Sequence, residues 1–240
     1  LFYINDIYSQ KQLYAGISKV SIIPENKLLF GNKKINDTLY AKTLIIDNLE
    51  EKVAFIIIDS QGIAQYIVDE IKKNINLKTN FPTQNIVVAT THTHSGIISN
   101  TSPENFNNSK LNEYQLFLIK TITNGFISAY TNLIPSKIAW ANFDKSEYVF
   151  NRRWYTKKLN MNPYGIMDSI IMNPGSSLRK QLIKPAGPID PQISFIALQT
   201  TSNVPLAILA NYSLHYVGGV EKDVISADYF GFFDTNLNKL

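Results

Sequence analysis

The chain has 240 residues, of which 45% are hydrophobic and 18% are charged, so it can bury a sizeable core and is not a disordered chain. Its 23 Lys and Arg against 19 Asp and Glu give a formal net charge of only +4, without any basic run, which disfavours a nucleic-acid partner. The absence of cysteine excludes disulfides and a thiolate metal site, and no apolar run is long enough to span a bilayer.

The first part of the chain alternates between apolar runs typical of strands and one helical pattern. A polar turn between two of the runs predicts a hairpin whose second strand is fully buried, and apolar residues at helical spacing predict a helix. The expected strands are Tyr14–Ile22, Leu39–Asp47, Val53–Asp59 and Asn85–Ala89, and the expected helix is Ala64–Ile75.

The rest of the chain predicts one long helix, three further strands and two loops. The helix should be closed by Pro135, and the second loop is rich in turn formers. In chain order we expect a loop at 97–109, a helix over Leu111–Leu133, a short strand over Ile138–Phe143, a loop over Tyr155–Pro188, and strands over Ile193–Gln199 and Leu206–Tyr212. The length favours one domain, and the order of elements predicts an α/β fold with a mixed β-sheet flanked by helices.

Two of the three histidines stand together in the segment Thr90-Thr91-His92-Thr93-His94-Ser95-Gly96, directly after an expected strand. Histidines at positions i and i+2 project to the same side if the backbone is extended, and imidazole is a good zinc ligand at neutral pH. The third histidine, His215, also follows an expected strand. Since α/β sheets place their sites at the carboxyl ends of strands, the three histidines suggest a metal site, although each by itself would more often be an ordinary polar residue.

Other residues have both a chemical and a structural interpretation. Arg152, in the segment Asn151-Arg152-Arg153, could hold a substrate oxygen or could be a surface arginine stacked on aromatic rings. Asp228 could cap a helix or reach the metal site, and Asp59 has the same ambiguity. Ser95 is a minor candidate for a nucleophile, because its surroundings do not form a nucleophile elbow.

Taken together, these segments resemble the neutral/alkaline, non-lysosomal ceramidase family. The resemblance rests on segments that occur in the family's order and cover nearly the whole chain. They are Ala15–Val20, Leu39–Lys42, Val53–Asp59, Ala89–Gly96, Asn151-Arg152, Gly187–Pro191, Asn211–His215 and Ser226–Tyr229.

The resemblance implies a zinc hydrolase that cleaves the amide of N-acylsphingosine into fatty acid and sphingosine. It implies that His92 and His215 are zinc ligands, that His94 lines the active site, and that Arg152 lies in the substrate pocket. The family completes its zinc shell with a Glu and a Tyr, which we expect beyond Leu240. Residues 1–240 would then be the N-terminal part of a larger catalytic domain.

One departure from the family pattern leaves the substrate open. The family continues its histidine motif with proline and glycines, whereas Ile97, Ile98 and Ser99 follow Gly96 here. A related metal hydrolase of another amide or ester, and a non-catalytic module with a relict site, therefore remain alternatives.

The expected partners are a lipid-like amide substrate and, peripherally, a membrane surface. The sequence does not determine the oligomeric state. Because the chain begins with Leu1 rather than Met, we expect a processed N-terminus and a secreted or periplasmic location.

Overall fold

The computed structural model describes residues 12–25, 33–97, 111–215 and 219–239, and these form two compact units. The first unit comprises the described residues of 1–139, 197–207 and 216–240, and the second comprises 140–196 and 208–215. Each unit is described below by itself.

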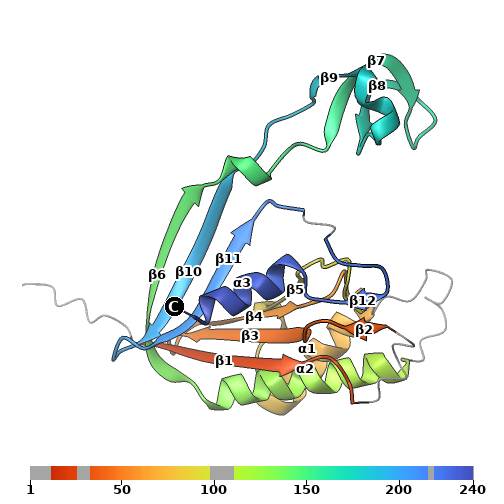
Figure 1. Cartoon of the computed structure of the whole chain (residues 1–240). Helices are drawn as coiled ribbons and strands as arrows, with labels where there is room; N and C mark the ends of the chain where they lie inside the picture. Colours follow the sequence, from red (N-terminus) through yellow and green to blue (C-terminus); the bar gives the residue numbers. More distant parts are fainter. Residues whose placement is uncertain (1–11, 26–32, 98–110, 216–218, 240) are drawn as a thin grey trace, which may run out of the picture. The chain divides into compact units, whose positions relative to one another are not determined.

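A mixed β-sheet forms the centre of the first unit (Figure 1). β1 (Leu13–Ser21) pairs antiparallel with β3 (Tyr40–Asp47), β3 pairs antiparallel with β4 (Lys52–Ile58), and β4 pairs parallel with β5 (Ile86–Thr90). The full hydrogen-bonded order is β11-β10-β6-β1-β3-β4-β5. The boundary between the units falls within the three remaining strands, β6 (Ile134–Asp144), β10 (Gln192–Thr200) and β11 (Pro205–Tyr212). This sheet, together with the helices, confirms the predicted α/β class.

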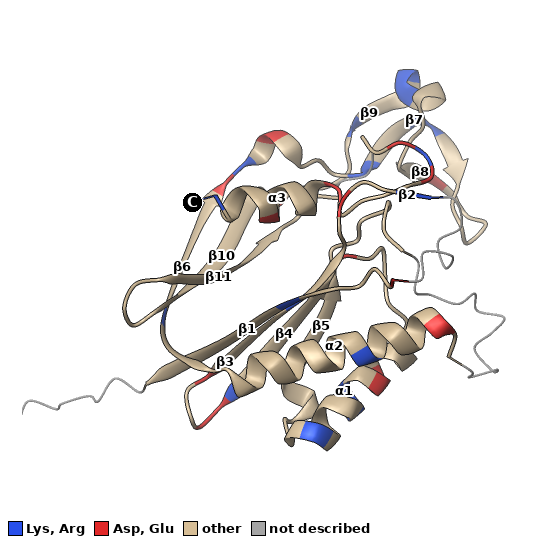
Figure 2. Ribbon diagram, turned by 60° about the horizontal axis from the view of Figure 1, so that its bottom comes forward, with Lys and Arg blue, Asp and Glu red and all other residues tan. Residues whose placement is uncertain are grey.

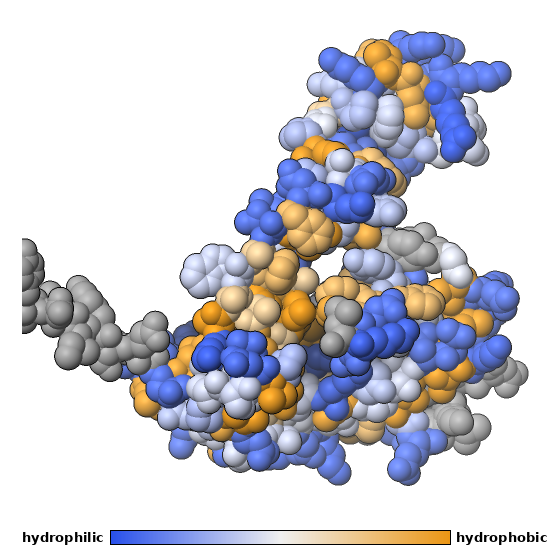
Figure 3. Space-filling model, turned by 60° about the vertical axis from the view of Figure 1, so that its left-hand side comes forward, coloured by the Kyte–Doolittle hydropathy of each residue, from blue (hydrophilic) through white to orange (hydrophobic). Residues whose placement is uncertain are grey.

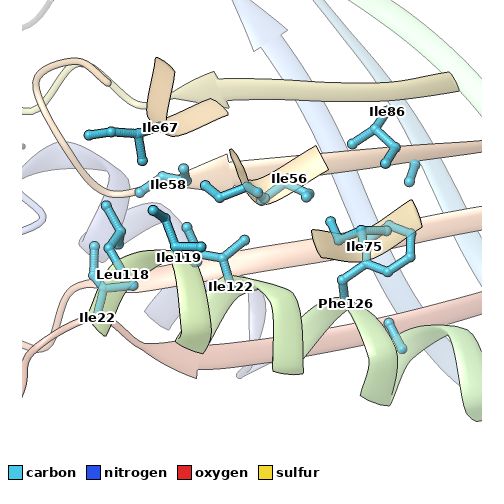
Figure 4. Packing of buried hydrophobic residues seen from close by; sticks show 14 of the residues in the cluster. Ile22, Ile56, Ile58, Ile67, Ile75, Ile86, Leu118, Ile119, Ile122 and Phe126 are labelled. Carbon is cyan, nitrogen blue, oxygen red and sulfur yellow. The ribbon is translucent and has the colours of Figure 1, made fainter. Parts of the chain in front are cut away.

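Two helices cover one face of this sheet, and their apolar sides form the core. α1 (Gln65–Thr79) buries the four isoleucine and valine side chains at helical spacing, and α2 (Glu113–Thr131) begins with a capping box between Asn112 and Gln115. Figure 4 shows the side chains of both helices meeting those of the strands, with Ile56, Ile75 and Phe126 among them. A Cβ atom added to Gly16 of β1 would lie 2.1 Å from the Ala129 carbonyl oxygen, so glycine at this position allows β1 and α2 to approach closely.

A third helix, α3 (Tyr229–Leu237), lies on the opposite face of the sheet (Figure 1). Val20 of β1 lies against Gly125 of α2, whereas the neighbouring Lys19 pairs with Asp234 of α3. Successive residues of a strand point to opposite faces, so these contacts place α2 and α3 on different sides. A two-residue strand, β12 (Val224–Ile225), pairs parallel with β2 (Lys34–Ile35) just before α3 begins.

The second unit contains a small sheet of its own, in the order β8-β7-β9. Its strands are β7 (Arg153–Met161), β8 (Met167–Met172) and β9 (Leu182–Pro185), with a 3-10 turn over Ser176–Gln181. The prediction of a loop over Tyr155–Pro188 was therefore wrong. The register of β7 against β8 shifts between Tyr155 and Asn160, and many side chains on these strands are solvent-exposed, so the regular alternation that identifies a strand is absent.

Several element boundaries also differ from the prediction. β4 alternates between buried and half-buried residues, and only Ile86 of β5 is buried, because β5 is at the edge of the sheet. Pro135, expected to close the helix, lies at the second position of β6, an 11-residue strand. Near the start of a strand, the missing amide of proline removes few hydrogen bonds from the sheet. Residues 98–109 of the predicted loop lie outside the described residues. None of the described helices is long and apolar enough to cross a membrane.

Candidate metal centre

The histidine motif lies in a turn at the carboxyl end of β5, beside the end of its parallel neighbour β4. β5 ends at Thr90, and the Thr91 amide donates a hydrogen bond to the Ile58 carbonyl oxygen at 2.9 Å. His92 has a positive φ of 62°, so the chain is not extended here as the sequence pattern had assumed. This strained turn brings the motif next to the segment that leaves β4, Asp59-Ser60-Gln61.

The two histidine side chains converge in spite of the turn. His92 Nε2 and His94 Nε2 are 3.2 Å apart, and the two rings are nearly perpendicular. Thr93, between them, is buried, whereas both histidines are exposed. The side chains of His92 and His94 therefore lie on the same side, as expected for residues i and i+2, although the backbone conformation differs from that of a strand.

Hydrogen bonding fixes the tautomer of the neutral His92. Its Nδ1 is 2.6 Å from the Gln61 carbonyl oxygen, and since a carbonyl oxygen only accepts, Nδ1 carries the proton. His92 Nε2 is then the unprotonated nitrogen of the ring, and it is directed toward His94. A backbone carbonyl that holds the second ring nitrogen in this way is the usual support of a histidine that binds a metal.

This arrangement fits a zinc ion. Zinc binds histidine nitrogen at ~2.0–2.1 Å in tetrahedral geometry, so two ligand nitrogens lie about 3.3–3.4 Å apart. The observed 3.2 Å between the Nε2 atoms is close to that value. His92 and His94 therefore present nitrogen atoms that could hold a metal ion.

The buried side of the turn is fastened to the segment that precedes α3. Thr93 Oγ1 donates to the Ser226 carbonyl oxygen at 3.0 Å, and the Ser226 amide donates to the Ser95 carbonyl oxygen at 2.9 Å. Asp37, in turn, accepts hydrogen bonds from the Ser226 hydroxyl and from the Ala227 amide. Residues distant in sequence thus hold the histidine turn in place.

Asp228 caps α3, as the sequence suggested. Its Oδ1 accepts a hydrogen bond from the Tyr229 amide at 2.8 Å, whereas its buried Oδ2 has no hydrogen-bond partner among the described residues. Burial raises the pKa of Asp228, and the Tyr229 amide and the charge of His94 act in the opposite direction. The carboxylate therefore both caps the start of α3 and interacts electrostatically with one histidine of the pair.

Asp59 has a structural role. Its side chain is fully buried, and Oδ2 accepts hydrogen bonds from the Tyr40 amide at 2.9 Å and from Lys42 Nζ at 3.4 Å. These partners belong to β3, so this oxygen is directed to the interior of the sheet. Of the two interpretations of Asp59, the described contacts support the structural one.

The pH dependence of stability should reveal the buried carboxylate. Burial raises the pKa of Asp59 above its ordinary value of 3.8, more than Lys42 lowers it. As the pH rises from this value, the unfolded chain loses the proton first, so the free energy of unfolding should decrease until the folded-state pKa is passed. We expect Asp59→Asn to remove this decrease, as measured by urea unfolding at pH 4 and pH 7. The same pH dependence in both proteins would contradict the assignment.

Arg152 lines a cleft within the second unit. The cleft has a volume of about 250 Å³. It is lined by the segments Val149–Arg153 and Pro188–Asp190 and by the single residues Met172 and Ser213. Asn151 joins the two loops, because its Nδ2 donates to the Pro188 carbonyl oxygen at 3.0 Å. Asp190 accepts a hydrogen bond from Ser213 on the wall of the cleft. Arg152, for which the sequence allowed a substrate-binding or a surface role, thus lines a polar cleft.

The predicted site residues are divided between the two units. His92 and His94 lie together in the first unit, whereas Arg152 and His215 belong to the second. His215 follows the end of β11 at Tyr212, in agreement with its expected place after a strand. The main chain of Ser95 is bonded to Ser226, and the two histidines contact each other, which gives no support to a serine nucleophile.

Sequence reasoning missed two residues of the site's surroundings. Gln61 contacts both histidines, through its carbonyl oxygen on His92 and through its Nε2, 3.4 Å from His94 Nδ1. Asp37 anchors the segment around Ser226. Gln61 follows a strand that is the parallel neighbour of β5, and this position could have drawn attention to it, but nothing near Asp37 in the sequence does so.

No family model and no curated protein matches the sequence. Among solved structures, the chain is similar to neutral ceramidase from Pseudomonas aeruginosa, with a TM-score of 0.63 and 15% identity over 93% of this chain and 35% of that chain. It is also similar to a ceramidase complexed with C2, with a TM-score of 0.55 and 15% identity over 83% and 31% of the two chains. The chain spans about a third of the length of these ceramidases, and the likeness confirms the resemblance at the level of the fold.

Proposed function

We propose that this chain is the histidine-bearing part of a zinc-dependent amide hydrolase that cleaves N-acylsphingosine into fatty acid and sphingosine. The observation that carries the proposal is the geometry of His92: its Nδ1 is held by the Gln61 carbonyl oxygen, which leaves Nε2 as the nitrogen that could bind a metal ion, and the His94 ring lies beside that Nε2. The fold that the chain shares with ceramidases supports the choice of reaction class.

In the proposed site, His92 and His215 are zinc ligands, and the remaining ligands are a Glu and a Tyr after residue 240. Bound zinc would supply a Lewis acid for the amide carbonyl and would lower the pKa of a water molecule toward ~7.

The other residues of this chain act on the substrate and on protons. His94 Nε2 lies 3.2 Å from His92 Nε2, so it would be close to a metal ion held by His92. We assign His94 the role of general acid, which donates a proton to the departing amine. Arg152 stabilises the oxyanion of the substrate with its guanidinium group.

A second candidate is a hydrolase of the same fold that acts on another amide or ester. The segment after Gly96 favours it, since Ile97 begins a sequence without the proline and glycines of the family. For either substrate we propose a secreted or periplasmic protein, as expected from the sequence.

The test uses the full-length protein. We expect about one zinc ion per chain by elemental analysis, and release of fatty acid from ceramide that is abolished by a chelator and restored by zinc. Short N-acyl amines and esters serve as comparison substrates, and faster cleavage of one of these would favour the second candidate. Protein without stoichiometric zinc and without amidase activity would contradict the proposal and favour a non-catalytic module.

A further inference from the structure

The turn that joins β7 to β8 exposes an unusual number of large hydrophobic side chains. We call residues 159–167 the β7–β8 tip. Five of its nine residues are exposed hydrophobic ones, Leu159, Met161, Tyr164, Ile166 and Met167, and Tyr164 is 87% exposed. The tip contains no charged residue. Scattered apolar residues on a surface are ordinary, but a continuous group of this kind marks a site of interaction.

Several main-chain groups of the tip are hydrogen-bonded within it. Asn162 Oδ1 accepts from the amides of Tyr164 and Ile166, both at 3.0 Å, and the Asn162 amide donates to the Ile166 carbonyl oxygen at 2.8 Å. Gly165 provides the positive φ of 76° that the turn requires and donates to the Asn162 carbonyl oxygen. Polar groups bonded in this way can enter an apolar medium at little cost, so the tip can present its side chains to lipid.

The sequence around the tip is basic. Residues 152–190 contain two acidic residues, Asp168 and Asp190, and seven basic ones, Arg152, Arg153, Lys157, Lys158, Arg179, Lys180 and Lys184. Figure 2 marks these Lys and Arg in blue around β7 and β9, and Figure 3 shows hydrophobic and hydrophilic side chains side by side on the small sheet at the top of the view. Lys157 and Lys158 are exposed and immediately precede the tip.

We propose that the β7–β8 tip inserts into the surface of an anionic phospholipid bilayer, with Lys157 and Lys158 at the level of the lipid phosphates. An aromatic and aliphatic tip with lysines directly behind it matches the apolar and anionic layers of such a surface. Protein interfaces, by contrast, are depleted of lysine. The inference does not depend on the zinc site, and it would hold if the chain catalysed another reaction.

The experiment is sedimentation of the full-length protein with vesicles of phosphatidylcholine, alone or mixed with phosphatidylserine. We expect binding to the mixed vesicles and at least about tenfold weaker binding for Tyr164→Ser/Ile166→Ser, because two inserted side chains are lost. The matched control is Leu49→Ser/Leu77→Ser, which removes two similarly exposed leucines of the first unit and should bind like the wild type. Lys157→Gln/Lys158→Gln should reduce binding to the mixed vesicles about tenfold or more.

Two results would overturn the inference. One is equal binding by the wild type and the tip variant, or no binding by the wild type. The other is a loss of several degrees in the melting temperature, or a change in oligomeric state, for the tip variant but not for the control. That result would show that the tip packs against protein instead of lipid.

Discussion

Replacing His92 with alanine is expected to lower the zinc affinity of the full-length protein by more than about 100-fold and to abolish hydrolysis. Loss of a residue that only orients a ligand already costs about 10–100-fold in affinity, and His92 is proposed as a ligand itself. Its Nδ1 proton is held by the Gln61 carbonyl oxygen, so Nε2 is the nitrogen that could bind the metal. Elemental analysis after dialysis and a ceramide hydrolysis assay measure the two effects, and His215→Ala should behave in the same way.

The matched control is His94→Ala, in the same turn and with similar exposure. Because we assign His94 to proton transfer, this variant should keep its zinc and lose about 10²–10⁴-fold in kcat. Equal loss of zinc in both variants would make His94 a ligand. Zinc content like that of the wild type in His92→Ala and His215→Ala would refute the metal site.

Replacing Phe126 with alanine is expected to lower the free energy of unfolding by about 3–5 kcal/mol, the range found for buried phenylalanines. Phe126 is fully buried in α2 (Figure 4). Its ring meets that of Phe81 edge-on, with 5.0 Å between the ring centroids. Alanine would leave a cavity between α2 and the sheet and would remove this aromatic contact. Urea unfolding followed by circular dichroism measures the change.

Leu116→Ala is the control, because Leu116 lies on the same helix and is 54% exposed. Its effect should remain within about 0.5 kcal/mol, as for other surface substitutions. A loss of less than 1 kcal/mol for Phe126→Ala would mean that α2 does not pack in the core as described.

Elements with a single buried face were predicted well. The helical spacing of Ile67, Val68, Ile71 and Ile75 predicted α1, and all four side chains are buried. Periodicity succeeds in such cases because burial on one side imposes apolar residues at regular intervals. The small sheet of the second unit escaped prediction because its strands expose many of their side chains and contain a register shift at Tyr155.

The sequence alone determined the core helices, most strands of the central sheet, and the position of each histidine just after a strand. These features depend on neighbours within a few residues, whose spacing can be read directly. Only the tertiary structure decided what surrounds the histidines. Gln61 reaches the histidines from the end of the adjacent strand β4, Ser226 is bonded to Thr93 between them, and Asp228 at the start of α3 interacts with His94 through its charge. The hydrogen bonds of Gln61 and Ser226 to this turn join residues that are 31 and 133 positions apart, and the pairing of strands and helices, not local spacing, brings these residues together.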